Sequence, residues 1–265
     1  MTRVSFLLWR PRAKRSLVEN TPYKVIECST MNKILVVQFR TDQSLPQEQR
    51  CIVDTVGEEV AKRLNFVNAV SDDLSSEILE NVSHVILGGS GEFFLGEGAG
   101  KDSWLPKVFL FVEKIYAKNI PVFGICFGHQ ILLSHAGAKV CKIPEMSEIG
   151  TFPVAMRKLS SSDELFGGFP EKYDGIFAHK ETPIEVPDHV RVLGSTERVE
   201  AGVVRIGARR AWGVMFHPDM NMMSVRERFS MFPHYADNPE KFAQALAAFR
   251  EAPVAPEILK KFVSL

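Results

Sequence analysis

Apolar residues along this chain fall into two patterns, short continuous runs and helically spaced stripes. The short runs, rich in β-branched residues, span 33–39, 66–70, 84–87 and 120–125. Such runs are typical of strands that are buried on both faces of a parallel sheet. Between the runs, apolar residues recur every three or four positions over 52–64 and 108–116, which predicts amphipathic helices. The alternation predicts an α/β fold, an open and mostly parallel sheet with helices on both faces.

The pattern changes after Gly137. Residues 138–216 are rich in β-branched residues, Gly and Pro, and contain few helical stretches. Strands predicted at 190–194, 200–206 and 211–216 follow one another through hairpin-like connections, which indicates antiparallel strands added to the sheet. A last helix is predicted from Asn238 and Pro239 onward. These elements predict one domain over residues 31–252, followed by a C-terminal tail at 253–265.

The first 30 residues differ in charge from the rest of the chain. Residues 1–30 hold six basic and two acidic side chains, and Pro11 and Pro22 interrupt any long amphipathic helix. Met31 directly precedes the first predicted strand. We therefore expect residues 1–30 to be a poorly ordered N-terminal extension outside the fold.

Composition narrows the functional classes. The 265 residues are 45% hydrophobic and 24% charged, which is ordinary for a globular domain. Lys plus Arg and Asp plus Glu are equal at 32 each, so no net charge favours nucleic acid, and no apolar run approaches a membrane span. The four cysteines form no CxxC pair, so neither a disulfide scaffold nor a metal site is indicated. We expect a cytoplasmic protein with no nucleic-acid or membrane partner.

The segment around Cys126 has the pattern of a nucleophile elbow. An apolar strand leads into Cys126 and a helix is predicted directly after it. Gly124 and Gly128 lie two residues to either side, where their missing Cβ atoms allow strand and helix to approach. The helix N-terminus favours the thiolate form, and its free N–H groups can receive an oxyanion. The alternative is a buried strand-end cysteine beside packing glycines.

Two further motifs favour the nucleophile. Gly88 and Gly89 follow a predicted neighbouring strand and can offer backbone N–H groups. A later strand stops at His217, and a carboxylate follows two residues on at Asp219. Histidine supplies a base or acid near neutral pH, and a carboxylate can fix its tautomer.

With these motifs, the sequence resembles the class I, triad-type glutamine amidotransferases. The family pattern G-x-C-x-G-x-Q is met by Gly124, Cys126, Gly128 and Gln130, and the family ending F-H-P-E appears as the segment 216–219. Order and spacing agree over roughly residues 33–220. The chain is similar to stand-alone relatives of the amidotransferase domain of GMP synthase. The resemblance implies a flavodoxin-like sheet.

The resemblance also implies the roles of the site residues. Cys126 would attack the side-chain amide of glutamine or of another γ-glutamyl compound. The N–H groups of Gly89, from the Gly88–Gly89 pair, and of Phe127 would hold the oxyanion. His217 would act as acid and base, with Asp219 orienting it. Gln130 would lie at the glutamine-binding end of the helix, and His179, also near the substrate, is expected to be a scaffold residue.

Two departures from the family keep alternatives open. Asp219 replaces the usual Glu and is one methylene shorter. The sequence also contains no Walker A pattern and no S-G-G-x-D-S pyrophosphatase loop, so we expect no cofactor and no synthetase within the chain. Ammonia would then pass to a separate synthetase subunit. The alternatives are a γ-glutamyl peptidase or hydrolase without a partner, and a catalytically silent regulatory or binding protein on the same scaffold.

Overall fold

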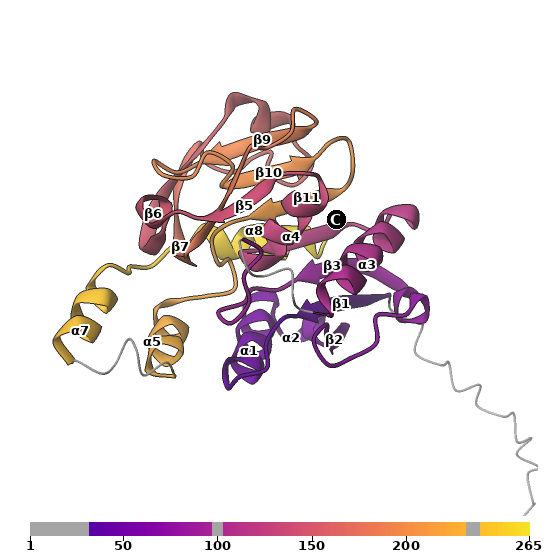
Figure 1. The fold of residues 1–265 in the computed structure, drawn as a ribbon, viewed down its shortest axis with the longest axis horizontal. Coiled ribbons are helices and arrows are strands. Elements are labelled where there is room, and N and C mark those ends of the chain that lie inside the picture. Colours follow the sequence, from indigo (N-terminus) through magenta and orange to yellow (C-terminus); the bar gives the residue numbers. More distant parts are fainter. Residues whose placement is uncertain (1–31, 97–102, 232–238) are drawn as a thin grey trace, which may run out of the picture. The chain divides into compact units, whose positions relative to one another are not determined.

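A nine-stranded mixed sheet organises the chain (Figure 1). The computed structural model describes residues 32–96, 103–231 and 239–265, so the extension predicted at 1–30 lies outside the described residues. The sheet order is β2-β1-β3-β4-β11-β10-β9-β6-β7. Its strands are β1 (Lys33–Gln38), β2 (Leu64–Asn68), β3 (Val82–Leu87), β4 (Val122–Ile125), β6 (Glu148–Met156), β7 (Lys172–His179), β9 (Val190–Ser195), β10 (Val203–Ile206) and β11 (Ala211–Val214).

The half of the sheet from β2 to β11 is parallel and has helices on both faces. Successive residues of β1 point to opposite faces, so Ile34 and Leu35 enter two separate hydrophobic clusters. The first cluster includes residues of α1 (Ser44–Val56), α5 (Met222–Ser230) and α8 (Ala255–Phe262). The second cluster includes residues of α3 (Leu105–Ala117) and α4 (Phe127–His135). The predicted α/β architecture is confirmed.

The other half of the sheet is antiparallel. Strands β11, β10, β9, β6 and β7 pair with reversed directions, as the hairpin-like pattern predicts. A separate two-stranded sheet pairs β5 (Lys139–Lys142) with β8 (Glu181–Ile184). Short 3-10 helices lie at Ser76–Leu79, Pro144–Met146 and Lys158–Ser162.

The first helical stripe is shorter than its apolar spacing predicts. Gly57 has φ of 84° and separates α1 from the single turn α2 (Glu58–Ala61). Leu64, which continues the helical spacing, is instead the first residue of β2, so this strand begins two residues before the predicted 66. A positive φ is accessible to glycine without strain, and it ends the helical repeat here.

The C-terminal tail predicted at 253–265 is wrong, because most of this segment is the amphipathic helix α8. Ile258, Leu259 and Phe262 are fully buried in the first cluster. The Phe262 ring lies 5.2 Å from that of Phe123 and 6.2 Å from that of Trp212, on strands β4 and β11. The helix α7 (Pro239–Ala247) precedes it, so the helix predicted from Pro239 is present but is not the last one.

The carboxyl ends of the parallel strands bring distant segments together. Arg40 follows β1, Gly88 follows β3, Cys126 follows β4, and His217 comes soon after β11. In open α/β sheets this edge is where ligands bind. None of the helices within the described ranges is long and apolar enough to cross a bilayer.

Candidate active site

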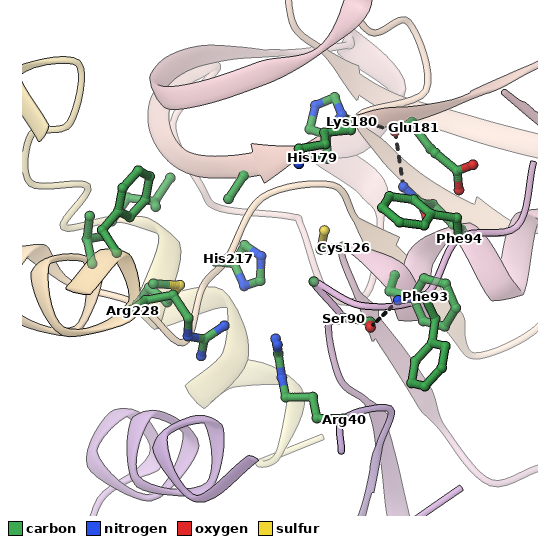
Figure 2. A pocket seen from close by; sticks show the side chains of 18 of the residues that line it. Arg40, Ser90, Phe93, Phe94, Cys126, His179, Lys180, Glu181, His217 and Arg228 are labelled. Carbon is green, nitrogen blue, oxygen red and sulfur yellow. Dashed lines mark hydrogen bonds between the residues drawn. The ribbon is translucent and has the colours of Figure 1, made fainter. Parts of the chain in front are cut away.

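A cavity of about 110 Å³ lies at the carboxyl edge of the parallel strands (Figure 2). Its polar lining residues are Arg40, Ser90, Cys126, Gln130, His179, Lys180, Glu181, His217 and Arg228. Its apolar lining residues are Phe93, Phe94, Phe127, Ile176, Ala178, Met220, Val225, Phe229 and Phe249. The cavity therefore combines titratable groups with extensive apolar surface.

Cys126 lies at the turn between β4 and α4 with φ of 49° and ψ of −97°. The two glycines that flank it are required by sterics. A Cβ on Gly124 would lie 2.6 Å from backbone atoms of Gly128, and a Cβ on Gly128 would lie 2.6 Å from the Cβ of Leu87 and closer still to its carbonyl oxygen. The positive φ and the two close approaches give the strained strand-to-helix turn that presents a nucleophile.

His217 lies between Cys126 and Asp219. Its Nδ1 is 3.2 Å from Asp219 Oδ1, and its backbone N–H donates to the Ile176 carbonyl at 2.7 Å. Figure 2 shows the imidazole facing the Cys126 sulfur. Burial alone would lower the pKa of His217, but the hydrogen bond and charge of Asp219, with a further contribution from Cys126, raise it to about 9. The structure thus brings the three residues together as a connected set.

Asp219 is held in its ionised form. Burial would raise the pKa of this carboxyl group, yet the hydrogen bond and charge of His217, together with the charge of Arg228, lower it below its usual range. Asp219 and His217 are 5% and 4% exposed, so little solvent screens their interaction. The shorter side chain reaches the imidazole because the two residues lie two positions apart in one tight turn.

The glycine pair after β3 departs from the expected arrangement. The Gly88 N–H donates to the Val37 carbonyl at 2.9 Å, within the strand pairing. The Gly89 N–H, expected to hold an oxyanion, instead donates to the buried carboxylate of Glu48 at 3.0 Å. In this structure a carboxylate 41 residues away occupies the donor, and the oxyanion role of Gly89 stays a prediction. The Phe127 N–H, at the first turn of α4, has no partner among the described residues.

Comparison with known proteins identifies the family of this chain. Residues 53–229 match the sequence profile of the family described as glutamine amidotransferase class-I, which is more than half of the chain. The chain belongs to the class-I glutamine amidotransferase family. Curated relatives include the glutamine-hydrolysing GMP synthases of Syntrophomonas wolfei, 30% identical over 61% of this chain, and of Aquifex aeolicus, 29% identical over 41%. The matched regions are 30% and 20% of those relatives, so the chain corresponds to less than a third of their length.

Solved structures share the fold of this amidotransferase-family chain. A glutamine amidotransferase from Thermotoga maritima superposes with a TM-score of 0.67 at 22% identity, covering 87% of this chain and 96% of that one. A glutamine amidotransferase from Methylobacillus flagellatus gives a TM-score of 0.64 at 18% identity, with coverages of 88% and 95%. At these identities the likeness establishes the fold.

Gln130, the last residue of the family pattern at the elbow, lines the cavity. Its Nε2 donates to the backbone carbonyl of Glu181 at 3.1 Å, which leaves its Oε1 without a donor among the described residues. The Glu181 carboxylate accepts from the N–H groups of Leu95 and Gly96, at 2.7 and 2.9 Å. Gln130 is therefore fixed in place with one polar atom available to a ligand.

His179 has both ring nitrogens engaged. Nδ1 lies 3.1 Å from the Glu181 carbonyl oxygen, and Nε2 lies 3.1 Å from a carboxylate oxygen of Glu148. Both neighbours are hydrogen-bond acceptors, a backbone carbonyl and a buried carboxylate, and they hold the ring in one orientation. No ring nitrogen remains for a substrate, which fits the expected scaffold role.

Several residues of this site carry no local signal in the sequence. Glu48 bonds to Gly89, pairs with Arg40 at 3.1 Å and accepts from Gln38 at 2.8 Å, all within the interior. Arg228 comes from α5, far along the chain. The spacing of these residues matches no motif. Glu48 is a buried charge within α1, but the sequence alone does not show that it is buried. Within the described ranges there is no group of three or more residues that could hold a metal ion.

Proposed function

We propose that this protein hydrolyses the side-chain amide of glutamine, or of a related γ-glutamyl compound, through a thioester on Cys126. The observation that carries the proposal is the position of Cys126 on a strained elbow, with the His217–Asp219 pair beside it. A buried thiol, an oriented imidazole and a helix N-terminus are the parts that acyl transfer requires.

In the first half of the reaction, His217 takes the thiol proton and the sulfur attacks the amide carbon. The oxyanion is stabilised by the Phe127 N–H, which no described residue occupies. A second donor is available from the Gly89 N–H once it leaves Glu48. The C–N bond then breaks, and the imidazolium transfers its proton to the departing nitrogen. Asp219 keeps the imidazolium stable throughout.

In the second half, His217 removes a proton from water and the resulting hydroxide attacks the thioester. The sulfur leaves as thiolate, which regains the proton from His217, and a carboxylic acid is released. No cofactor enters these steps. A free thiol at Cys126 is required, and the cysteine is unpaired here, in keeping with a reducing cytoplasm.

The fate of the released nitrogen is a separate matter. The curated relatives are GMP synthases, and this chain matches less than a third of their length, so a separate synthetase subunit is the partner to look for. Co-elution with a synthetase would favour ammonia transfer. Full turnover by the isolated chain would favour a γ-glutamyl hydrolase.

Ammonia release from glutamine tests the proposal. The wild-type chain should release ammonia, and Cys126→Ala should abolish release while leaving the thermal midpoint nearly unchanged. Cys141→Ala is a matched control, since Cys141 is a free cysteine away from the cavity. A glutamine-like electrophile should label Cys126, as found by peptide mapping. Turnover that survives Cys126→Ala would refute the mechanism, and an inert wild type would favour the silent scaffold.

A further inference from the structure

Helix α5 places a buried cation at the cavity, and no described carboxylate is hydrogen-bonded to it. Arg228 lines the cavity and is 9% exposed. Its Nε donates to the neutral side-chain oxygen of Gln47, and its Nη2 is buried without any hydrogen-bond partner. Among the described residues, no carboxylate oxygen lies within 4.0 Å of its guanidinium. A buried charged group with an unsatisfied hydrogen-bond donor destabilises the fold. The unsatisfied donor of Arg228 therefore points to a ligand that accepts a hydrogen bond from it.

The nearby carboxylates are committed to other partners. Asp219 bonds to His217, and Glu48 is shared between Arg40, Gln38 and the Gly89 N–H. Burial, and then the positive charge of Arg40, lower the pKa of Arg228 to about 10, although the negative charges of Glu48 and Asp219 act in the opposite direction. Figure 2 shows the guanidinium ends of Arg40 and Arg228 pointing toward one another near His217. Two cations that face each other at a cavity favour an anion between or beside them.

The reaction geometry decides which part of a substrate reaches Arg228. The leaving nitrogen must lie within hydrogen-bond reach of His217, because His217 protonates it. In Figure 2, Phe94 and Glu181 lie on the Cys126 side of the cavity, whereas Arg228 lies on the far side of His217. The glutamyl part therefore occupies the side of Gln130 and Glu181. Whatever is attached to the leaving nitrogen extends toward Arg228.

The surroundings of Arg228 are apolar. Val225 and Phe229 share its face of α5 at helical spacing, and both line the cavity, as does Met220. The Phe249 ring packs edge-on against Phe229 with centroids 5.1 Å apart. Ammonia needs no such wall, whereas an amine with a hydrophobic side chain would be bound by it.

We propose that Arg228, with Arg40 beside it, forms a carboxylate-binding subsite for the leaving group, and that the preferred substrates are γ-glutamyl amides of apolar amino acids. Hydrolysis breaks the γ-amide C–N bond, forms the Cys126 thioester and releases the amino acid with the proton that His217 delivers. This inference rests on the proposed function and specifies its substrate class. Arg228 determines specificity here and takes no part in bond breaking.

The test compares three substrates on the full chain: glutamine, γ-glutamyl-phenylalanine and γ-glutamyl-phenethylamide, which has the same amine without the carboxylate. For the wild type, kcat/KM should be about tenfold or more higher for the phenylalanine compound than for the phenethylamide, as expected of a hydrogen bond to a charged group. Arg228→Gln should bring this ratio close to one, and Arg228→Lys should restore part of it. Arg226→Gln, an exposed change on the same helix, should leave the ratio at the wild-type value.

Because the ratio compares two substrates on one enzyme, a general loss of activity does not move it. A ratio near one in the wild type, with glutamine still hydrolysed, overturns the subsite and leaves the proposed function standing. No turnover of any of the three substrates overturns both. If Arg228→Gln instead weakens glutamine relative to 4-aminobutyramide, which lacks the α-carboxylate, then Arg228 binds the glutamyl part and the leaving-group assignment is wrong.

A second measurement does not depend on turnover. In the Cys126→Ala chain, γ-glutamyl-phenylalanine should raise the thermal midpoint more than the phenethylamide does, since a ligand that binds the native state stabilises it. Adding Arg228→Gln should remove that difference. Equal shifts from the two ligands in the Cys126→Ala chain would contradict the subsite.

Discussion

Replacing Asp219 by Asn removes the charge of the side chain that contacts His217 while nearly keeping its shape. Asn keeps the size of the side chain and can still present an oxygen to His217 Nδ1 over the 3.2 Å contact, but it carries no charge. Asp219→Asn should therefore preserve the turn after β11. What it removes is the stabilisation of the imidazolium.

The size of that stabilisation follows from the structure. The rise in the pKa of His217 from the ordinary 6.5 to about 9 is the net result of burial, which opposes it, and of Asp219 and Cys126, which cause it. At 1.36 kcal/mol per pKa unit this net rise corresponds to about 3 kcal/mol, which is on the order of a few hundredfold in the protonation equilibrium of the imidazole. An analogous Asp-to-Asn change in a serine protease lowers kcat about 10⁴-fold. We expect a loss of kcat between these limits.

The same pKa values predict how stability depends on pH. Because the pKa of His217 is raised in the folded state, its contribution is complete below about 6.5 and is lost as the pH rises through about 9. Because the pKa of Asp219 is lowered, its contribution is present above the ordinary carboxyl value and is lost as the pH falls through the folded value. The wild-type and Asp219→Asn chains should therefore differ most in unfolding free energy near pH 6, and less above pH 9.

The assays are ammonia release at neutral pH and urea unfolding at pH 6 and pH 9.5. Asp54→Asn serves as the control, because Asp54 is exposed and the same chemical change there should alter neither quantity. Asp219→Glu should be tolerated, since it restores the side-chain length usual in the family. If Asp219→Asn retains more than a tenth of wild-type turnover, another carboxylate holds His217 and the reasoning fails.

The remaining predictions concern stability. Gly128→Ala should lower the free energy of unfolding by about 3 kcal/mol and remove most of the activity, because the new Cβ would clash with the backbone of β3. Gly202→Ala is the control, because its Cβ would have no atom nearer than 3.6 Å, and it should change neither quantity in the same denaturation and turnover assays. Glu48→Gln should cost about 3–5 kcal/mol by leaving its buried arginine partner uncompensated. The exposed ion-pair change Glu200→Gln should cost under about 1 kcal/mol, and equal losses for both would contradict this account. A chain that starts at Met31 should unfold at the wild-type midpoint, and a large loss would show that the preceding residues pack on the domain.

Local spacing made much of this protein predictable. In the run 33–39, apolar residues occur in both alternating sets of positions, which predicts a strand that is covered on both faces, and β1 is such a strand. The elbow is equally local, because Gly124, Cys126 and Gly128 lie within five consecutive residues and their steric demands follow from the turn itself. The His217–Asp219 contact likewise spans two positions.

Two predictions from local spacing were wrong because tertiary contacts decided the structure, namely the length of the first helix and the C-terminal tail. In the sequence the helical spacing over 52–64 continues past Gly57, but Gly57 has φ of 84° and ends the helix, and Leu64 pairs with Ile34 of β1. The segment 253–265 contains no strong motif, and a helix of this length is not stable in isolation. Its buried apolar residues stabilise the helix because they cover one face of the sheet.

The polar network around the site was decided by the tertiary structure. Glu48 reaches Gly89 across 41 residues, His179 reaches Glu148 across 31, and Arg228 reaches Gln47 across 181. A buried charge is tolerated only where the fold supplies its partner, and the sequence does not show which distant residue that will be. The sequence by itself predicted the sheet and the local turns that carry Cys126 and His217. Only the fold determined that the Gly89 donor is occupied and that Arg228 lies beside the cavity with Nη2 lacking a hydrogen-bond partner, because both depend on which side chains the packed layers bring within a few ångströms of each other.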